Sequence, residues 1–526
     1  MSSQLALPTG WVEAHLETVA LVIQGQSPPG STYNLEGEGL PFFQGKAEFG
    51  DLHPIPVKWC SAPNKIAEPC DVLISVRAPV GPTNLADRRC CIGRGLAAIR
   101  PLAGMPSKYF LYYLRHTGSL LAKQATGTTF KAINGDQLCK HPVWIPPYTE
   151  QKRIIEAIES NLTKLDAAVA ALKRVKSNLK RYRASVLKAA VEGRLVPTEA
   201  ELARKEGRDY EPASKLLERI LKERRRRWEE AELEKLKAKG KIPKTTTLEQ
   251  TALEGDKKHQ WKAKYKEPKA PDTTNLPELP EGWCWASLEQ LSSTIRNGYS
   301  KAPRETSGVP ILRISAVRPM SVDTSDIRFL PLPIAAYEGF VIANGDLLFT
   351  RYNGNPHLVG VCGLVKKLNQ PIVHPDKLIR VEIVTGNVDP GFIEIACNCG
   401  VSRSHVEKRV RTTAGQSGIS GGDLKAMPIP VPPLLEQRRV FFEVQRVWSV
   451  ADSVERIRGH SERKCTFLKQ SILKAAFEGK LVEQCSEDEP ASVLLNRIEA
   501  ERDSAGMESS RGKKGRKGKM SRAKDC

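Results

Sequence analysis

The sequence has no apolar run approaching the roughly 18 residues that a membrane-spanning helix needs. Its first stretch, MSSQLALPTGW, lacks the charged region followed by an apolar region that marks a secretory signal. Histidine is scarce, with 9 in 526 residues, and the histidines are dispersed along the chain. We therefore expect a protein of the cytoplasm without a histidine-based catalytic or metal centre.

Motifs that bind metals or nucleotides are also missing. The 12 cysteines are scattered, and the tight pairs Cys90-Cys91 and Cys397-x-Cys399 have neither a second pair nor a histidine at zinc-site spacing. No G-x-x-x-x-G-K-[ST] loop occurs, and the triplets Gly37-Glu38-Gly39 and Gly93-Arg94-Gly95 lack a third glycine and a following helix. We expect no metal and no cofactor on this chain.

One short run is similar to part of a catalytic motif. Pro146-Pro147-Tyr148 matches the end of the Asn/Asp-Pro-Pro-Tyr/Phe motif that holds the target amine in amino-methyltransferases, but the residue before it is Ile145, which has no acceptor. We predict no catalytic residues and a chain that is not an enzyme. A stand-alone methyltransferase is the enzyme alternative, and only that alternative expects methyl transfer by the purified chain without a partner.

The charge of the chain is strongly basic. Lysine and arginine number 81 against 60 for aspartate and glutamate, a formal net charge of +21. Such an excess favours a polyanionic partner, nucleic acid first and an anionic membrane surface second. A basic surface without a specific ligand is the plainer interpretation.

The most informative feature of the chain is an internal repeat. Residues 185–196 read SVLKAAVEGRLV and residues 471–482 read SILKAAFEGKLV, with nine of the twelve positions identical. Other blocks return in the same order: Leu7-Pro8-Thr9-Gly10-Trp11 as Leu279-Pro280-Glu281-Gly282-Trp283, Glu150-Gln151-Lys152-Arg153-Ile154 as Glu436-Gln437-Arg438-Arg439-Val440, and Glu211-Pro212-Ala213-Ser214 as Glu489-Pro490-Ala491-Ser492. The stretches between them have diverged, which indicates one frame carrying two different modules.

The local patterns predict an α+β fold. Strand-like runs occur at 71–77, 311–314 and 346–350, and residues 109–123 have a helical pattern. We expect two globular domains separated by two long antiparallel coiled-coil helices, with an internal pseudo-twofold repeat. The predicted segments are a globular domain at 1–145, a central helical region with a charged helix and linker at 146–275, a second globular domain at 276–430, a C-terminal helical region at 431–505 and a flexible basic tail at 506–526.

The long helices are predicted from apolar spacing. Between about 149 and 192, apolar residues recur three and four apart, with one phase slip: Ile155, Ile158, Leu162, Leu165, Val169, Leu172, then Val175, Leu179, Tyr182 and Val186. A less regular stripe follows the second globule: Phe441, Val444, Val447, Ala451, Val454, Ile457, Leu468 and Ile472. Neither helix can bury its stripe alone, so we expect them to pack together. Another helix is predicted at 213–237, whose four arginines at 224–227 suit either DNA phosphate or a solvated face.

These features favour recognition of DNA as the function. Both globules have loops that contain glycine and carry side chains of the kinds that contact base edges and phosphates. The candidates in the first globule are Gln24, Gln26, Ser27, Arg77, Thr128, Thr129 and Lys131. Those in the second are Arg313, Arg351, Tyr352, Asn353, Arg403, Arg411 and Gln416. Each of them could instead be an ordinary turn or surface residue.

The ordered motifs resemble a known family. Leu-Pro-x-Gly-Trp at the start of each globule, Pro-Pro-x-x-Glu-Gln at each long helix and the repeated exit motif are similar to the DNA-specificity subunit of type I restriction-modification systems. The linker Trp261-x-x-x-Tyr265-x-x-Pro268 fits the same pattern, and the stretch 346–354 is similar to one subtype of its target-recognition domains. The resemblance covers nearly the whole chain.

The resemblance implies a division of labour within a prokaryotic, cytoplasmic complex. Each globule would read one half of a bipartite, asymmetric DNA site, and the helices would set the spacer between the halves. Two modification (methyltransferase) subunits would dock on the chain, and restriction subunits would join through the complex. S-adenosylmethionine, ATP and Mg would then be bound by the partner subunits. We predict that docking uses Glu150, Gln151, Arg153, Glu436, Gln437 and Arg439.

Two other interpretations stay open. The chain could be the specificity module of a fused restriction-methylation enzyme, or a coiled-coil scaffold that binds nucleic acid without sequence preference. The scaffold explains the helices and the charge but not the paired, diverged globules.

Overall fold

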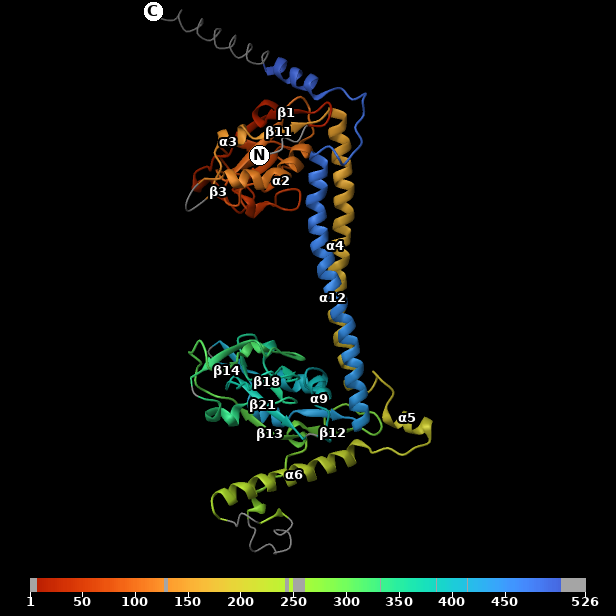
Figure 1. Ribbon diagram of the computed structural model, residues 1–526. Helices are drawn as coiled ribbons and strands as arrows, with labels where there is room; N and C mark the ends of the chain where they lie inside the picture. The colour runs from red at the N-terminus through yellow and green to blue at the C-terminus, as the bar shows by residue number, and fades with distance from the viewer. Residues whose placement is uncertain are drawn as a thin grey trace, which may run out of the picture. The chain divides into compact units, whose positions relative to one another are not determined.

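The computed structural model describes residues 7–126, 131–241, 246–248, 261–331, 333–384, 386–413 and 415–502. They form two compact units: unit 1 combines Met1–Arg174 with Ile457–Cys526, and unit 2 is Val175–Arg456 (Figure 1). Both units mix helices with strands, which confirms the predicted α+β class. Within the described ranges, no helix is both long enough and apolar enough to cross a membrane.

Unit 1 contains three small sheets. A pair, β1 (Val12–His15) with β11 (Pro142–Ile145), lies beside a four-stranded sheet in the order β2 (Ala20–Gln24), β10 (Leu96–Pro101), β7 (Val72–Ser75) and β8 (Thr83–Leu85). The third sheet has the order β3 (Tyr33–Asn34), β5 (Trp59–Cys60), β4 (Leu40–Phe43), β9 (Cys90–Ile92) and β6 (Ile66–Ala67). The run at 71–77 therefore does contain the predicted strand.

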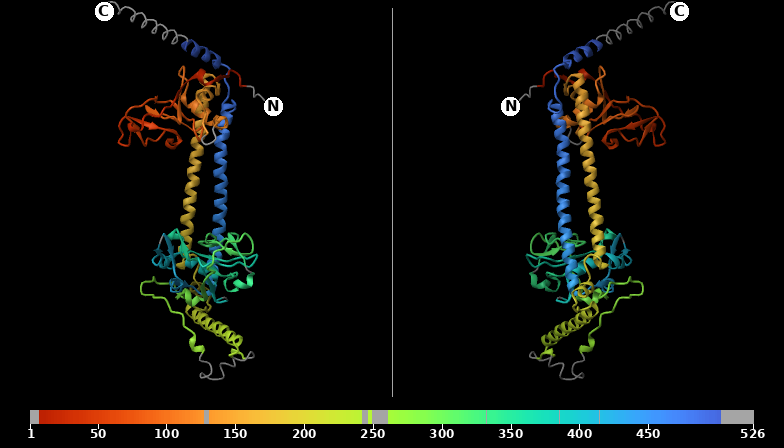
Figure 2. Two further views of the ribbon diagram at one scale, coloured as in Figure 1. Left: turned by 90° about the vertical axis from the view of Figure 1, so that its left-hand side faces the viewer. Right: turned by 90° about the vertical axis from the view of Figure 1, so that its right-hand side faces the viewer.

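Helices complete unit 1. Among the described residues they include α1 (Leu16–Val19), α2 (Ser107–Gln124), α3 (Gly135–Cys139), the first part of α4 (Tyr148–Val191) and a helix at 491–502, which confirms the helices predicted at 109–123 and from about 149. The core draws on both ends of the chain, because Phe477 of α12 (Leu434–Phe477) packs between Tyr109 and Tyr113 with ring centres 5.5 and 5.1 Å away. Both views in Figure 2 show the start of α4 beside the end of α12 in this unit.

Unit 2 contains a strand framework that matches that of unit 1. A pair, β12 (Cys284–Ser287) with β24 (Pro428–Val431), accompanies a four-stranded sheet in the order β13 (Ser292–Asn297), β21 (Leu378–Ile383), β18 (Leu347–Thr350) and β20 (Cys362–Leu364). Its smaller sheets are β14 (Val309–Leu312) with β17 (Ile327–Leu330), β15 (Val317–Arg318) with β16 (Ser321–Val322), and β19 (Tyr352–Asn353), β23 (Gln416–Gly418) and β22 (Arg411–Thr413). The strand predicted at 311–314 begins and ends earlier, because residues 314–316 turn as a short 3₁₀ helix.

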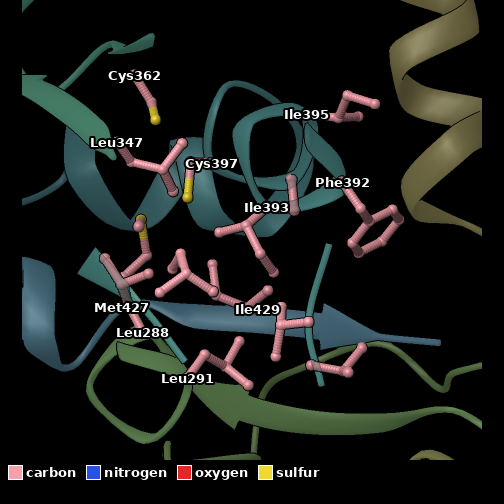
Figure 3. Close-up of a cluster of buried hydrophobic side chains, with 14 of the residues drawn as sticks. Leu288, Leu291, Leu347, Cys362, Phe392, Ile393, Ile395, Cys397, Met427 and Ile429 are labelled. Atoms are coloured by element: carbon pink, nitrogen blue, oxygen red, sulfur yellow. The ribbon is translucent and has the colours of Figure 1, made fainter. Parts of the chain in front are cut away.

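In the described part of unit 2, six α-helices lie wholly within the unit: α5 (Glu199–Glu206), α6 (Ala213–Ala238), α8 (Leu288–Leu291), α9 (Pro390–Cys397), α10 (Gly400–Glu407) and α11 (Gly421–Lys425). The helix α6 confirms the prediction at 213–237. Figure 3 shows apolar side chains of α8, α9 and β24 pointing toward one another in the core, among them Leu291, Ile393 and Ile429. This core supports the strands that carry the candidate site.

The long helices have contacts in both units. In unit 1, Lys469 of α12 pairs with Asp166 of α4, and in unit 2 Arg183 of α4 pairs with Asp452 of α12. The predicted apolar stripes need correction, because Tyr182 is 52% exposed and Ile457 67% exposed. Apolar residues spaced three and four apart identify a helix. This spacing does not show which of the apolar residues face the partner helix.

The repeated sequence blocks converge at one place in unit 2, which we call the joint. The indole N–H of Trp283 donates to Glu436 in the first turn of α12, at 2.9 Å, and the backbone N–H of Glu199 donates to the same carboxyl at 2.8 Å. Gly193, just after α4, has φ +66°, and a Cβ there would lie 2.5 Å from Cγ of Pro280. Glycine is therefore needed at this position both for the backbone angle and for the close approach.

Unit 1 contains a joint with the same indole bond and the same close approach of a glycine to a proline, whereas Oε1 of Glu150 has no hydrogen-bond partner. Trp11 donates to Glu150 at 3.1 Å, and Gly479, with φ +69°, lies against Pro8, where an added Cβ would be 2.4 Å from Cγ. A backbone bond completes each joint: Ala491 donates to the carbonyl of Gly10 at 2.9 Å in unit 1, and Ala213 donates to the carbonyl of Gly282 at 2.8 Å in unit 2. Residues near the C-terminus thus close the joint of unit 1.

Burial raises the pKa of the glutamate carboxyl at each joint above its ordinary value. It raises the pKa of Glu436 to about 7, against the opposing effect of the hydrogen bonds from Glu199 and Trp283, and it raises the pKa of Glu150 in the same direction. Burial also acts to raise the pKa of Glu199, but its ion pairs with Arg439 and Arg208 outweigh that effect and lower it.

The stability of unit 2 should therefore depend on pH through Glu436. Because the pKa rises from 4.5 to about 7 on folding, the contribution is complete below pH 4.5 and is lost as the pH rises through 7. Urea titrations followed by tryptophan fluorescence should show an unfolding free energy that falls by roughly 2–3 kcal/mol from pH 5 to pH 8 because of this group.

The variant Glu436→Gln should lose that part of the pH dependence, since an amide has no proton to release. Glu443→Gln is the matched control on the same helix, because a hydrogen bond from Arg446 lowers the pKa of Glu443 and places its titration below this window. Equal pH dependence in the wild type and in Glu436→Gln would contradict the assignment.

Candidate nucleic-acid interface

Two of the candidate residues of unit 1, Ser27 and Arg77, lie close together beyond the ends of β2 and β7. The loop after β2 is held by backbone bonds from Gly25 to Leu96 and from Gln26 to Ile92, of 2.9 and 3.0 Å. Its next residue, Ser27, accepts a hydrogen bond from the backbone N–H of Arg94 at 3.3 Å. The side chain of Gln26 is exposed, while that of Gln24 lies against Gly135.

Arg77 follows β7 and faces the same space. Ser27 and Arg77 line a cavity of about 290 Å³ together with Gln44, Lys46 and Arg94. The exposed side chains of Arg77, Lys46 and Arg94 have no ion pair among the described residues, so three cations surround one small cavity without internal neutralisation. Gln44 and Lys46 were not predicted as site residues, because they lie in the segment after β4, distant in sequence from Ser27 and Arg77, and Arg94 was predicted only as part of a glycine triplet.

Two other predictions for unit 1 have different outcomes. Lys131 is next to Arg77 in space, because its carbonyl accepts from the backbone N–H of Ala78 at 2.9 Å. Thr128 and Thr129 lie outside the described residues.

Five candidate residues of unit 2 lie in or beside the small sheet of β19, β23 and β22: Arg351, Tyr352, Asn353, Arg411 and Gln416. A cavity of about 440 Å³ is lined by Arg351, Tyr352, Arg409, Arg411, Thr413, Gln416, Gly418, Ile419, Ser420 and Asp423. The side chains of Arg411 and Gln416 are exposed and have no hydrogen bond or ion pair to the described part of the chain. Both are therefore available to a ligand.

Arg351 is fixed at the base of this cavity. Its backbone N–H donates to Lys377 at 2.8 Å, and its guanidinium lies 4.7 Å from the centre of the Tyr352 ring. One guanidinium nitrogen, Nε, is buried without a hydrogen-bond partner, and Nη1 makes a long contact of 3.4 Å with the carbonyl of Asp376. This planar cation stacked on an aromatic ring suits contact with a phosphate or a guanine edge.

The frame behind the cavity holds β18, the strand that leads into Arg351. Arg380 of β21 forms an ion pair with the buried Asp346, just before β18, at 2.6 Å. In unit 1, Arg100 of β10 pairs with Asp71, just before β7, at 2.8 Å, so Arg77 is supported in the same way.

Three candidate residues of unit 2 have partners within the chain, and their contact with DNA stays a prediction. The guanidinium of Arg403 donates to the carbonyls of Val359 and His357 at 2.7 and 3.0 Å and pairs with Glu407, and the side chain is only 13% exposed. Arg403 therefore fastens α10 to a loop. Asn353 accepts from the backbone N–H of Asn355 and stabilises a turn.

Arg313 is the third of these residues. It pairs with Asp326 at 3.4 Å and does not line the cavity. Sequence alone could not separate these internal partners from ligand contacts.

The predicted docking residues also need correction. Glu150, Gln151, Glu436 and Gln437 are at most 1% exposed, and each glutamine donates to a proline carbonyl of its own helix start, Pro146 or Pro432. Side chains this buried cannot contact a partner, so their repetition reflects the joint. Arg153 and Arg439 are half-buried and pair with Asp488 and Glu199.

The described residues contain no group of three or more histidine, cysteine, aspartate or glutamate side chains placed to hold a metal. Two separate cavities lined with cations and hydrogen-bonding side chains are therefore the chemically distinctive features of this chain. Such surfaces are suited to binding a polyanion and reading its edges.

Comparison with known proteins identifies the family. Residues 8–181 match the family model described as the type I restriction modification DNA specificity domain. The specificity subunit of the type I restriction enzyme EcoKI from Escherichia coli K12 is 28% identical over 529 residues, covering 95% of this chain and 97% of that protein. The StySPI specificity subunit from Salmonella potsdam is 24% identical, covering 96% of this chain and 99% of that protein.

A solved structure is also similar over part of the chain. The HsdS subunit from Thermoanaerobacter tengcongensis is 51% identical over 33% of this chain and 41% of that one, with a TM-score of 0.29. The family match and the two alignments over nearly the full length agree with the order of the repeated motifs. The chain belongs to the family of type I restriction enzyme specificity subunits.

Proposed function

We propose that this chain recognises DNA sequence within a type I restriction-modification complex, with each unit reading one half of a bipartite site. The observation that carries the proposal is the pair of different cavities on matching frames. The cavity of unit 1 presents Ser27, Arg77 and Arg94, and that of unit 2 presents Arg351, Arg411 and Gln416. Arginine and amide side chains discriminate bases in the major groove by paired hydrogen bonds, so two unlike sets would read two unlike sequences.

The long helices would connect the two reading modules as an antiparallel coiled coil and set the spacer between half-sites. The matching joints support this proposal, because each one fixes a globule to the start of one long helix and the end of the other. Equivalent contacts at both joints also favour an internal pseudo-twofold arrangement.

The chemistry of the complex would belong to partner subunits. We infer that two methyltransferase subunits bind this chain and supply S-adenosylmethionine, and that restriction subunits bring ATP and Mg. The specificity module of a fused restriction-methylation enzyme is the second candidate, supported by the same cavities, and it differs only in the partner chain.

The test of the function is single-molecule sequencing of host DNA with the gene intact and deleted. Loss of one bipartite methylated motif on deletion is the expected result. A methylome that keeps every motif in a strain whose methyltransferase subunits are expressed and active would refute the proposal.

Substitutions in the two cavities should affect opposite halves of the site. Arg411→Ala removes an exposed side chain of unit 2, and Arg77→Ala removes one of unit 1, so neither should disturb folding. Loss of one base contact should reduce discrimination by about 1–3 kcal/mol, or roughly 5- to 150-fold. The measurement is a fluorescence-anisotropy titration of the assembled complex with duplexes altered in one half-site at a time.

The two variants serve as controls for each other in that experiment. Arg411→Ala should relax one half-site and Arg77→Ala the other. If both relaxed the same half-site, or if discrimination survived and assembly failed, the assignment of one cavity to each half-site would be wrong.

Docking of a partner subunit should use exposed apolar residues of α12 instead of the buried glutamates. In unit 2, Leu435, Phe442 and Val450 are 54%, 69% and 56% exposed and recur seven and eight residues apart, on one side of the helix. Exposed apolar side chains in such a row commonly mark a protein interface.

The variant Phe442→Ser should therefore weaken binding of the methyltransferase subunit roughly tenfold or more, since a buried phenylalanine contributes about 1.5–3 kcal/mol. Lys180→Ser, an exposed position on α4, is the control and should bind normally. The measurement is surface plasmon resonance with the purified methyltransferase subunit. Unchanged binding by Phe442→Ser would remove this row from the interface.

A further inference from the structure

Unit 2 contains a second, larger cavity that the base-reading proposal does not use. Its volume is about 1060 Å³, and it is bordered by α10, α11 and the segment 269–276. The residues with polar or charged side chains in its lining are Lys269, Asp272, Asn275, Glu289, Arg403, Ser404, His405, Lys408, Arg409 and Lys425. We call this cavity the basic groove.

The acidic residues of the groove leave most of its cations without a counter-ion. Glu289 pairs with Lys425 at 3.0 Å, and Asp272 accepts from the backbone N–H and the hydroxyl of Thr274. Lys269 and Lys408 have no ion pair with the described residues. Arg409 also has no ion pair with the described residues, so the groove contains three cations without a carboxylate partner: Lys269, Lys408 and Arg409.

Arg409 has only one weak internal contact. Its guanidinium donates to the carbonyl of His405, four residues earlier, at 3.3 Å. The ring of His405 is 2.9 Å from the carbonyl of Asp423, and burial lowers its pKa, so the positive charge of the groove comes from its lysines and arginines. A surface of this kind attracts an extended anion.

The basic groove adjoins the base-reading cavity. Arg409 lines both spaces, and α11 lies at the border, with Ser420 and Asp423 on the side of the base-reading cavity and Gly422 and Lys425 on the side of the groove. A double helix that places its base edges against Arg411 and Gln416 and runs past this border brings its phosphates to the groove.

We infer that the basic groove binds the sugar–phosphate backbone of the DNA immediately beside the half-site read by unit 2. This inference rests on the proposed function of unit 2. Duplex DNA carries one negative charge per about 1.7 Å of its axis, so a groove that adjoins the reading cavity meets several phosphates. These contacts position the protein on the duplex and contribute affinity without sequence preference.

The test is the salt dependence of DNA binding by the assembled complex. The variant Lys269→Ala/Lys408→Ala leaves both cavities' base-reading residues in place, and Lys215→Ala/Lys301→Ala removes the same charge from exposed positions of unit 2 outside the groove. The groove variant should bind all duplexes more weakly. Its plot of log association constant against log salt concentration should be less steep than that of the wild type by roughly 1.8, or about 0.9 per lost contact. The control should keep the wild-type slope, and both variants should keep wild-type discrimination between half-site sequences.

A second measurement locates the contact on the DNA. Duplexes are shortened stepwise from each end, outside the bipartite site and outside the spacer. Shortening beside the half-site of unit 2 should weaken the wild type and have little further effect on the groove variant, whereas shortening at the other end should affect both proteins equally.

The possible outcomes separate the inference from the function on which it rests. If the wild-type complex discriminates half-sites but the groove variant keeps the wild-type slope, the inference is wrong and the proposed function stands. An altered base preference in the groove variant would also overturn it, since the groove would then read sequence. A wild-type complex that fails to discriminate any sequence would instead refute the proposed function.

Discussion

Each unit of this chain depends on one buried hydrogen bond, from a tryptophan indole to a glutamate in the first turn of a long helix. Trp11 and Glu150 form it in unit 1, and Trp283 and Glu436 form it in unit 2. A buried indole N–H or carboxyl without a partner is costly, so each group requires the other. The bond thereby fixes the direction in which the helix leaves the globule.

The frame and the reading surfaces are built from separate parts of the sequence. The joint, the paired strands and the ion pairs Arg100–Asp71 and Arg380–Asp346 recur in both units. The cavities lie on loops and short strands beyond this frame, where the two units differ. A substitution in a cavity can therefore change what is read without changing how the globule is held, which is the usual advantage of placing function on loops.

Much of the frame was predictable because it depends on local signals. Apolar spacing identified the long helices, and short β-branched runs identified strands such as β7 and β18. The roles of repeated polar residues were not predictable, since a sequence does not distinguish a buried glutamate such as Glu436 from an exposed one. The same limit applies to Arg403, whose guanidinium donates to carbonyls of a distant loop, and to Lys46, which reaches its cavity from a 3₁₀ helix distant in sequence from Arg77.

Unit 1 is built from two segments that are distant in the sequence, and this has a consequence for the synthesis of the chain. Its core includes Phe477 of α12 and Leu494, and its joint is closed by Ala491, so the globule of unit 1 is complete only after residues 477–494 have been synthesised. Unit 2, which is continuous in sequence, can finish first. At about 5–20 residues per second, the interval between Arg174 and Ile457 lasts roughly 15–60 s. During that interval the nascent first globule exposes apolar surface that only its own C-terminal segment can cover, which makes it a natural client for chaperones.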